Sequence, residues 1–419
     1  MEREIIMIED RKKPELLIPA ANLEVLKTAV MYGADAVYIG GDMYGLRAKA
    51  KNFSMEEMQD GIAFAHAHGK KVYVTANITA HNRDLPGIRK YFQELRTFGE
   101  NRPDAIIISD PGVFVIAKEE LPECELHIST QANNTNYETY RFWYKLGATR
   151  VVSARELSLQ ELSELRANIP PEMEIETFVH GAMCIAYSGR CLLSNYFTRR
   201  DANLGACTHS CRWRYHIVEE TRPGEYLPIE ENERGTYIFN SKDLCMIEYI
   251  PELVKAGIDS FKIEGRMKTA LYVATVARTY RKAIDEFFAD PELYREHKSL
   301  YMEEVRKGVN RQFTTGFFFH KPTHEDQIYE HNTYEKAYTY LGTIQGEKNG
   351  FYMLEQKNKF SVGEEIEIIK PNGDTIKAAV KKILDEQGEE MESCPHPKQA
   401  IYVDLGTKLD SFDILRRKE

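Results

Sequence analysis

The cysteines of this chain are gathered in one stretch of the sequence. Five of the seven lie within 62 residues: Cys184, Cys191, Cys207, Cys211 and Cys245. A folded chain of 419 residues does not need disulfides to hold its core, so this cluster indicates a metal site or a reactive centre. Thiolates are soft ligands that suit zinc and iron–sulfur clusters. This stretch is therefore the first candidate for the chemistry of the protein.

The spacing of these cysteines bears on which metal they could hold. It is C-x6-C-x15-C-x3-C-x33-C, and no CxxC pair is present. Zinc sites usually contain two tight pairs, so the spacing favours an irregular cage for an iron–sulfur cluster. His180 and His209 are close enough in sequence to complete a mixed zinc site, and reduced structural or redox thiols are a third interpretation. The remote Cys124 and Cys394 are expected to be buried apolar thiols.

Arginines accompany the cysteines. Residues 181–216 contain a single acid, Asp201, and five arginines: Arg190, Arg199, Arg200, Arg212 and Arg214. Because the whole chain has a net charge of −10, this is a basic segment in an acidic protein. The segment could bind a phosphate backbone or a small anionic molecule. The competing interpretation is that these arginines pair with distant carboxylates.

The first 270 residues repeat one pattern, in which a short apolar segment precedes an amphipathic helical one. Several of the helical segments begin at Asn or Ser and end at Gly, which are helix-capping signals. Such alternation predicts a parallel sheet covered by helices on both faces. Eight units predict an α/β fold of the (β/α)8 TIM-like barrel type, with an open doubly wound sheet as the alternative. The predicted strands are 15–20, 36–40, 71–77, 105–110, 125–130, 150–156, 174–181 and 260–266.

Polar side chains stand at the ends of these predicted strands, where barrels build their active sites. Four of them are our candidate catalytic residues: Arg155, His180, Glu264 and Arg266. For any single one, a structural place in a polar rim is the simpler interpretation. Asn77, Asp110, Gln131 and Glu156 occupy similar positions. The connection after the seventh strand is an insertion, 181–259, that contains the cysteine cluster, and we expect it to lie over the mouth of the barrel.

The chain is expected to contain two domains. A barrel domain covers 1–310 and ends in two helices, 268–290 and 293–308; a linker covers 311–334. From 335 to 419 short alternating segments and a Pro-Asn-Gly-Asp turn at 371–374 predict a small β-barrel. Such barrels often bind RNA or proteins, but many only pack against a neighbour.

Some functional classes are disfavoured by the sequence. The start resembles no signal peptide and no run approaches ~18 apolar residues, so we expect a cytoplasmic protein without membrane spans. HExxH, GxSxG, P-loop and GxGxxG motifs are absent, which disfavours standard metalloproteases, serine hydrolases, NTPases and nicotinamide dehydrogenases. A cysteine nucleophile beside His180 stays open, because catalytic triads are spatial.

A longer motif surrounds the first two clustered cysteines. Glu176-x-Phe178-x2-Gly181-Ala182-Met183-Cys184-x4-Gly189-x-Cys191-x-Leu193-Ser194 resembles the signature of peptidase family U32, the collagenase-like proteins. The similarity extends to NSKDL before Cys245, to FKIEGRMK, to NRQFTTGF and to the C-terminal region. The resemblance therefore covers essentially the whole chain.

This resemblance implies a barrel-like catalytic domain and two kinds of activity. Some members of the family are named proteases. Others take part in hydroxylation of ribosomal RNA, of the ubiquinone ring, or of the tRNA wobble uridine to 5-hydroxyuridine. The length and the added β-domain make this chain most similar to the tRNA branch, which depends on prephenate. The resemblance thus implies tRNA and prephenate as partners, with a family paralogue or a second copy as further candidates, and a U32-type peptidase as the alternative function.

Hydroxylating members of the family also imply a cofactor. They carry a 4Fe-4S cluster held by four cysteines, and the matching positions here are Cys184, Cys191, Cys207 and Cys245. Cys211 could replace Cys207. Zinc remains the alternative metal.

Overall fold

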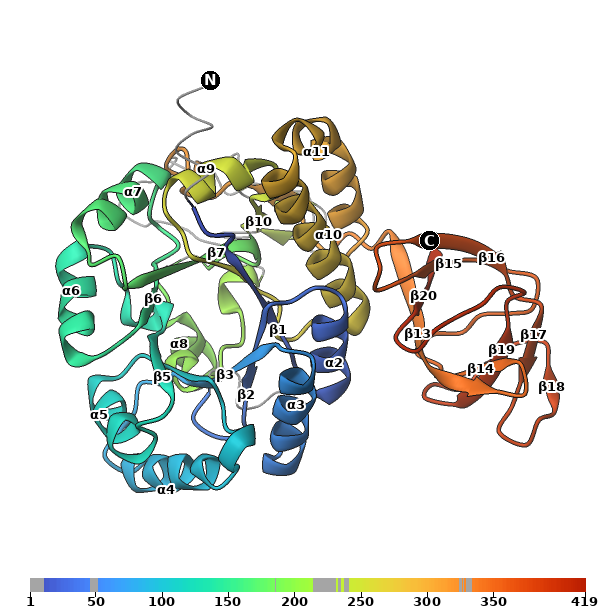
Figure 1. Ribbon diagram of the computed structural model, residues 1–419, viewed down its shortest axis with the longest axis horizontal. Helices are drawn as coiled ribbons and strands as arrows, with labels where there is room; N and C mark the ends of the chain where they lie inside the picture. The colour runs from blue at the N-terminus through green and yellow to red at the C-terminus, as the bar shows by residue number, and fades with distance from the viewer. Residues whose placement is uncertain are drawn as a thin grey trace.

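The structure is a computed structural model with two domains, an α/β barrel and a C-terminal β-sheet domain (Figure 1). It describes residues 11–45, 52–184, 186–213, 231–232, 235–236, 241–323, 326, 328 and 334–419.

Eight parallel strands form the barrel. They pair in chain order, and the last strand closes the ring by pairing with both the first and the seventh. This closure confirms the predicted (β/α)8 barrel and rules out the open doubly wound sheet. All eight predicted strands are present: β1 (Glu15–Pro19), β2 (Ala36–Gly40), β3 (Lys71–Ala76), β4 (Ala105–Ile108), β5 (Glu125–Ile128), β6 (Arg150–Val152), β7 (Glu174–Gly181) and β11 (Ser260–Ile263).

Helices surround this ring of strands (Figure 1). Ser54 begins one of them, as the sequence pattern predicts, and both Ser54 and Ser158 form complete capping boxes. The helices are α2 (Leu23–Met31), α3 (Met55–Ala67), α4 (Leu85–Arg96), α5 (Pro111–Glu120), α6 (Tyr137–Leu146), α7 (Leu159–Asn168), α9 (Ile250–Lys255), α10 (Ala270–Ala289) and α11 (Pro291–Arg306). Among the helices that the structure describes, none has the length and apolar character needed to cross a lipid bilayer.

The interior of the barrel contains buried charges that the sequence analysis did not anticipate. Arg150 donates to Glu15 Oε1 at 2.6 Å and to Glu176 Oε2 at 3.1 Å. Lys262 Nζ donates to Glu176 Oε1 at 2.5 Å. Buried charges persist only when they are paired and hydrogen-bonded, and this network satisfies both conditions. It lies toward the amino ends of the strands, the end of such barrels associated with stability rather than catalysis.

The C-terminal domain is an antiparallel eight-stranded sheet in the order β16-β15-β20-β13-β14-β19-β17-β18. It curves as a half-barrel, which confirms the predicted small β-domain. The predicted turn at 371–374 joins β15 to β16, where Ile369 pairs with Thr375. The strands are β13 (Tyr338–Lys348), β14 (Phe351–Glu355), β15 (Glu365–Ile369), β16 (Thr375–Ala379), β17 (Lys382–Leu384), β18 (Glu390–Met391), β19 (Ala400–Asp404) and β20 (Ile414–Lys418).

The two domains touch through polar contacts on α2, α10 and α11. The hydroxyl of Tyr32 donates to Ile369 O at 2.7 Å and to Phe412 O at 2.9 Å. Glu304 on α11 accepts from Arg416 on β20 at 3.1 Å. Figure 1 shows the β-domain beside these helices, to one side of the barrel.

Candidate functional site

The carboxyl ends of the barrel strands bring two of the four candidate catalytic residues into contact. Arg155 follows β6 and Glu264 follows β11, and Arg155 Nη2 lies 3.8 Å from Glu264 Oε2. Arg155 Nη1 also donates to Ser188 Oγ at 3.2 Å. Arg155 Nε is buried without a hydrogen-bond partner among the described residues. The guanidinium is therefore fixed in place while part of its donor capacity is unused.

The ring of Phe178 supports this arginine. Phe178 comes from β7, and Arg155 Cζ lies 3.9 Å from its ring centroid. Lys262 Nζ lies 5.5 Å from the same ring. Cations over an aromatic face are attracted by the ring quadrupole, so Phe178 orients the guanidinium. This role of Phe178 was not predicted from the sequence, although Phe178 stands in the quoted motif two residues from the buried Glu176.

Arg266 occupies another part of the same end of the barrel. Its Nη1 donates to Thr75 Oγ1 at 3.1 Å and its Nη2 donates to Asn52 Oδ1 at 3.1 Å. The side chain is buried. Arg266 thus links the segment after β11 to the end of β3.

His180 has a different environment from the one expected of it. The pairing of β7 with β11 shifts register between Lys262 and Ile263, so His180 pairs with Ile263. Its buried ring contacts Tyr280 and Tyr272 of α10, with Nδ1 3.4 Å from the Tyr280 hydroxyl. Burial, together with nearby Lys268, lowers the pKa of His180 to about 3. His180, one of the four candidate catalytic residues, is thus a neutral imidazole packed against α10 and buried away from solvent.

The insertion lies across the mouth of the barrel. It contains α8 (Leu193–Thr198), which Figure 1 shows within the outline of the strand ring. Thr79 N, after β3, donates to Asn203 O at 3.2 Å. Asn133, after β5, donates to Ser188 O at 2.9 Å and accepts from Arg190 Nε at 2.6 Å. These contacts join the insertion to loops that follow the barrel strands.

The far end of the insertion returns to the barrel wall. β10 (Asp243–Cys245) pairs antiparallel with β7, so that Cys245 lies opposite His180. β12 (Phe313–Thr314) then pairs with β10, which makes part of the predicted linker a strand of the barrel domain. The short strands β8 (Glu231–Asn232) and β9 (Gly235–Thr236) form a separate ladder within the insertion.

The clustered cysteines differ in exposure. Cys184 and Cys207 are exposed, Cys191 and Cys211 are half-buried, and Cys245 is buried. Cys245 Sγ lies 4.0 Å from the Tyr280 hydroxyl, and burial raises the pKa of this thiol to about 12. The remote Cys124 and Cys394 are buried, as predicted.

The clustered cysteines differ from a formed metal site in their arrangement. The donor set has the soft chemistry that an iron–sulfur cluster or zinc needs. However, no three His, Cys, Asp or Glu side chains of the described residues are grouped closely enough to hold a metal ion. The cysteines have suitable donor chemistry, but their side chains would have to move together to hold such a group. No chemical step is therefore derived through it.

The predicted anion-binding arginines are only partly described. Arg190, Arg199 and Arg200 are exposed. No carboxylate of the described residues lies within ion-pair distance of Arg199 or Arg200, which disfavours the structural pairing hypothesis for these two. The side chain of Arg212 and the whole of Arg214 lie outside the described residues.

Comparison with known proteins places the chain in a family. Residues 21–328 match the protein family described as "Peptidase family U32", and residues 336–416 match the one described as "Peptidase family U32 C-terminal domain". The chain belongs to peptidase family U32.

Three similar proteins of known sequence have names that refer to RNA. The chain is 42% identical to tRNA hydroxylation protein P1 of Bacillus subtilis, over 97% of this chain and 95% of that protein. It is 39% identical to tRNA hydroxylation protein P of Escherichia coli, over 97% of both. It is 35% identical to the 23S rRNA 5-hydroxycytidine C2501 synthase of Escherichia coli, over 65% of this chain and 39% of that protein.

Two glycines of the U32 signature hold the insertion close to the mouth. Gly181 has φ 104°, and a Cβ there would lie 2.4 Å from the carbonyl oxygen of Glu264. Gly189 has φ 75°, and a Cβ there would lie 2.8 Å from Gln131 Oε1. Only glycine combines a left-handed backbone with so close an approach. The signature thus shapes the contact between the insertion and the strand ends.

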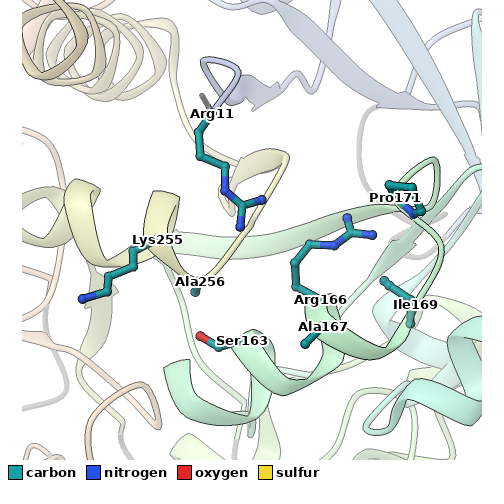
Figure 2. Close-up of a pocket in the computed structure, with 8 residues that line it drawn as sticks. All are labelled: Arg11, Ser163, Arg166, Ala167, Ile169, Pro171, Lys255 and Ala256. Carbon is teal, nitrogen blue, oxygen red and sulfur yellow. The ribbon is translucent and has the colours of Figure 1, made fainter. Parts of the chain in front are cut away.

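Two hollows of this U32 protein lie at the opposite end of the barrel. One, of about 340 Å³, is lined by residues before β7 and β11, including Arg166 and Lys255. Figure 2 shows Arg11 and Arg166 beside this hollow and Lys255 directed away from it. Arg166 donates to Met173 O at 2.9 Å and to Asp259 at 3.3 Å, so it braces the strand starts. The other, of about 510 Å³, includes Glu15 and Lys71 at the starts of β1 and β3. Neither hollow adjoins the strand ends that carry Arg155 and Glu264.

Proposed function

We propose that this protein takes part in hydroxylation of the wobble uridine of tRNA to 5-hydroxyuridine. The observation that carries the proposal is the similarity to two tRNA hydroxylation proteins over nearly the full length of the chain, both domains included. The name of the ribosomal RNA synthase supports the broader class, RNA hydroxylation.

The reaction defines what the site must supply. Forming 5-hydroxyuridine replaces the C5–H bond of the base by a C5–O bond and removes two electrons from the ring. It therefore requires an oxygen source and a two-electron acceptor. Arg155, fixed over Phe178 with an unused donor, is suited to hold an anionic group at the mouth. Arg266 provides a second buried cation at the same end.

We further propose prephenate as the co-substrate and a 4Fe-4S cluster as the cofactor. Prephenate is a dicarboxylate, and bidentate pairing with Arg155 or Arg266 would suit its carboxylates. Cys184, Cys191, Cys207 and Cys245 would hold the cluster, with Cys211 as an alternative to Cys207. Because Cys245 Sγ lies beside the Tyr280 hydroxyl, its side chain would have to turn away from α10 to join the others. When bound, such a cluster supplies electron transfer.

The function is tested by nucleoside analysis. Transfer RNA from cells that lack their own tRNA-hydroxylating proteins is digested and analysed by mass spectrometry, with and without this chain. We expect 5-hydroxyuridine with the wild-type chain and a reduced amount with Arg155→Ala. Absence of 5-hydroxyuridine with the folded wild-type chain and a supply of prephenate would contradict the proposal.

The cofactor needs a separate measurement. The protein, purified without oxygen, should contain about four iron and four acid-labile sulfide per chain. Cys184→Ala and Cys245→Ala should lose both, whereas the matched control Cys124→Ala, at a remote buried thiol, should keep them. If the protein contained about one zinc per chain and no sulfide, the proposed cluster would be wrong and the cysteines would be assigned to a zinc site.

The alternative function, a collagenase-like peptidase, has weaker support. Cys245 is unsuited to be its nucleophile, because a nucleophilic cysteine needs a lowered thiol pKa and burial raises the pKa of Cys245 to about 12. The imidazole of His180 is packed against α10. A peptidase would hydrolyse denatured collagen in highly purified protein and lose that activity in Cys184→Ala.

A further inference from the structure

The insertion displays aromatic side chains to solvent. Tyr196 is 75% exposed, Phe197 45% and Trp213 40%. Their rings are neighbours: the centroids of Tyr196 and Phe197 are 5.1 Å apart, and those of Phe197 and Trp213 are 6.2 Å apart. These three residues are called the aromatic face below. Exposed apolar groups that cluster in this way mark binding surfaces more often than single exposed residues do.

Polar contacts on the other side of α8 hold this face outward. Ser194 is buried, and its Oγ accepts from Thr208 N at 3.1 Å. Asn195 Nδ2 donates to Asp201 Oδ1 at 2.5 Å. Because α8 is anchored through these residues, the rings of the aromatic face are presented to solvent rather than to the barrel.

Positive charge borders the aromatic face. Arg199 ends α8 with φ 58°, Arg200 follows it, and both are exposed. Asp201 is the only acid in residues 181–213 and is engaged by Asn195. The protein as a whole has a net charge of −10, so this concentration of cations is local.

Rings beside cations match one class of ligand best. Unpaired nucleotides offer flat base faces for stacking and phosphates for arginine, whereas paired strands bury their base faces inside the helix. We propose that unpaired nucleotides of RNA stack on Tyr196, Phe197 and Trp213 while Arg199 and Arg200 bind their phosphates.

The position of the aromatic face relates this proposal to the barrel mouth. The segment that leads into α8 contacts Asn133 and, through Ser188, Arg155. Nucleotides bound on the aromatic face would therefore lie beside the strand ends. The inference deepens the proposed function and rests on it, since it assigns the part of the RNA substrate that this surface holds.

Binding of RNA to the full-length protein tests the proposal. The probes are an anticodon stem-loop RNA with its unpaired loop and a blunt RNA duplex of equal length. Tyr196→Ala and Phe197→Ala should each weaken binding of the stem-loop about ten-fold and leave the duplex unaffected. Tyr196→Phe keeps the ring and should restore binding. Phe142→Ala, at a 51% exposed aromatic on α6, is the matched control and should change nothing.

Salt dependence separates stacking from charge. Arg199→Gln and Arg200→Gln should each reduce the slope of log K against log salt by about 0.7, because each removes one phosphate contact with a single strand. The aromatic variants should keep the wild-type slope. Thermal unfolding confirms that each variant is folded.

Two results would overturn the proposal. One is wild-type affinity for the stem-loop in a folded Tyr196→Ala, Phe197→Ala double variant. The other is loss of self-association in that variant without loss of RNA binding, which would make the aromatic face a contact between copies. Nucleoside analysis distinguishes these failures from failure of the proposed function, because 5-hydroxyuridine formation by the wild-type protein is measured independently.

Discussion

At the scale of single residues, the contacts at the mouth of the barrel depend on the planar shape of the Arg155 guanidinium. Arg155 stacks on Phe178 and donates to Ser188, and an ammonium group can reproduce neither the planar stack nor the fork of donors. Arg155→Lys should therefore lower kcat/KM for tRNA hydroxylation about ten-fold or more, with little change in stability. The matched control is Arg141→Lys, at an exposed ion pair with Glu138. If Arg155→Lys kept the wild-type kcat/KM, the positive charge of Arg155 would be sufficient and its planar shape would not matter.

His180 gives a prediction about stability and pH. Its pKa is about 3 in the folded protein, because burial disfavours the charged imidazole, and about 6.5 when unfolded. Since the unfolded state binds the proton more tightly, stability falls as pH drops below about 6.5. Lowering the pH from 7 to 5 should therefore reduce the free energy of unfolding by about 2 kcal/mol through this residue alone. Urea unfolding at pH 7 and pH 5 measures this loss of unfolding free energy, which should be about 2 kcal/mol smaller in His180→Phe than in the wild type. An equal loss in both proteins would contradict the low pKa assigned to His180.

At the scale of elements, Tyr280 on α10 connects two strands of the barrel wall. Its hydroxyl donates to Val179 O at 3.0 Å on β7 and accepts from Met246 N at 3.3 Å, just after β10. Tyr280→Phe removes both of these bonds, while Met246 N keeps its bond to Val179 O at 2.9 Å, so the variant should lose about 1 kcal/mol of stability. Tyr140 is an informative control, because its buried hydroxyl has no hydrogen-bond partner within the described structure. Tyr140→Phe should be neutral or stabilising in the same urea measurements.

The elements also separate what the sequence could predict from what it could not. The eight strands and their helices followed from apolar segments and caps such as Ser54 and Ser158, because these signals are local. The register shift that turns His180 toward α10 depends on pairing with β11, more than 80 residues later in the chain. The exposed rings of Tyr196 and Phe197 carried no periodic signal in so short a helix. Whether the cysteines converge depends likewise on tertiary contacts rather than on spacing.

At the scale of the whole molecule, a charged contact joins the two domains. Arg416 of the β-domain is fully buried, and Glu304 accepts from it at 3.1 Å and from Arg278 at 2.5 Å. Burial opposes ionisation of Glu304, but Arg278, Arg416 and Lys307 together hold its pKa down to about 2. The β-domain is thus attached to α11 through a carboxylate that must stay ionised.

This carboxylate makes the domain contact sensitive to acid. A folded pKa of about 2 against an unfolded value of 4.5 gives a stabilisation of about 3 kcal/mol that is complete above pH 4.5. The stabilisation is lost as pH falls from 4.5 toward 2, because the protonated carboxyl no longer attracts the three cations. Glu304→Gln should remove most of it at pH 7 and should unfold with a weaker dependence on pH between 4.5 and 3. Glu303→Gln, at the exposed neighbouring position on α11, should behave as wild type. If Glu304→Gln and Glu303→Gln unfold alike at pH 7, the domains are held by the Tyr32 contacts and apolar packing instead of by this charge.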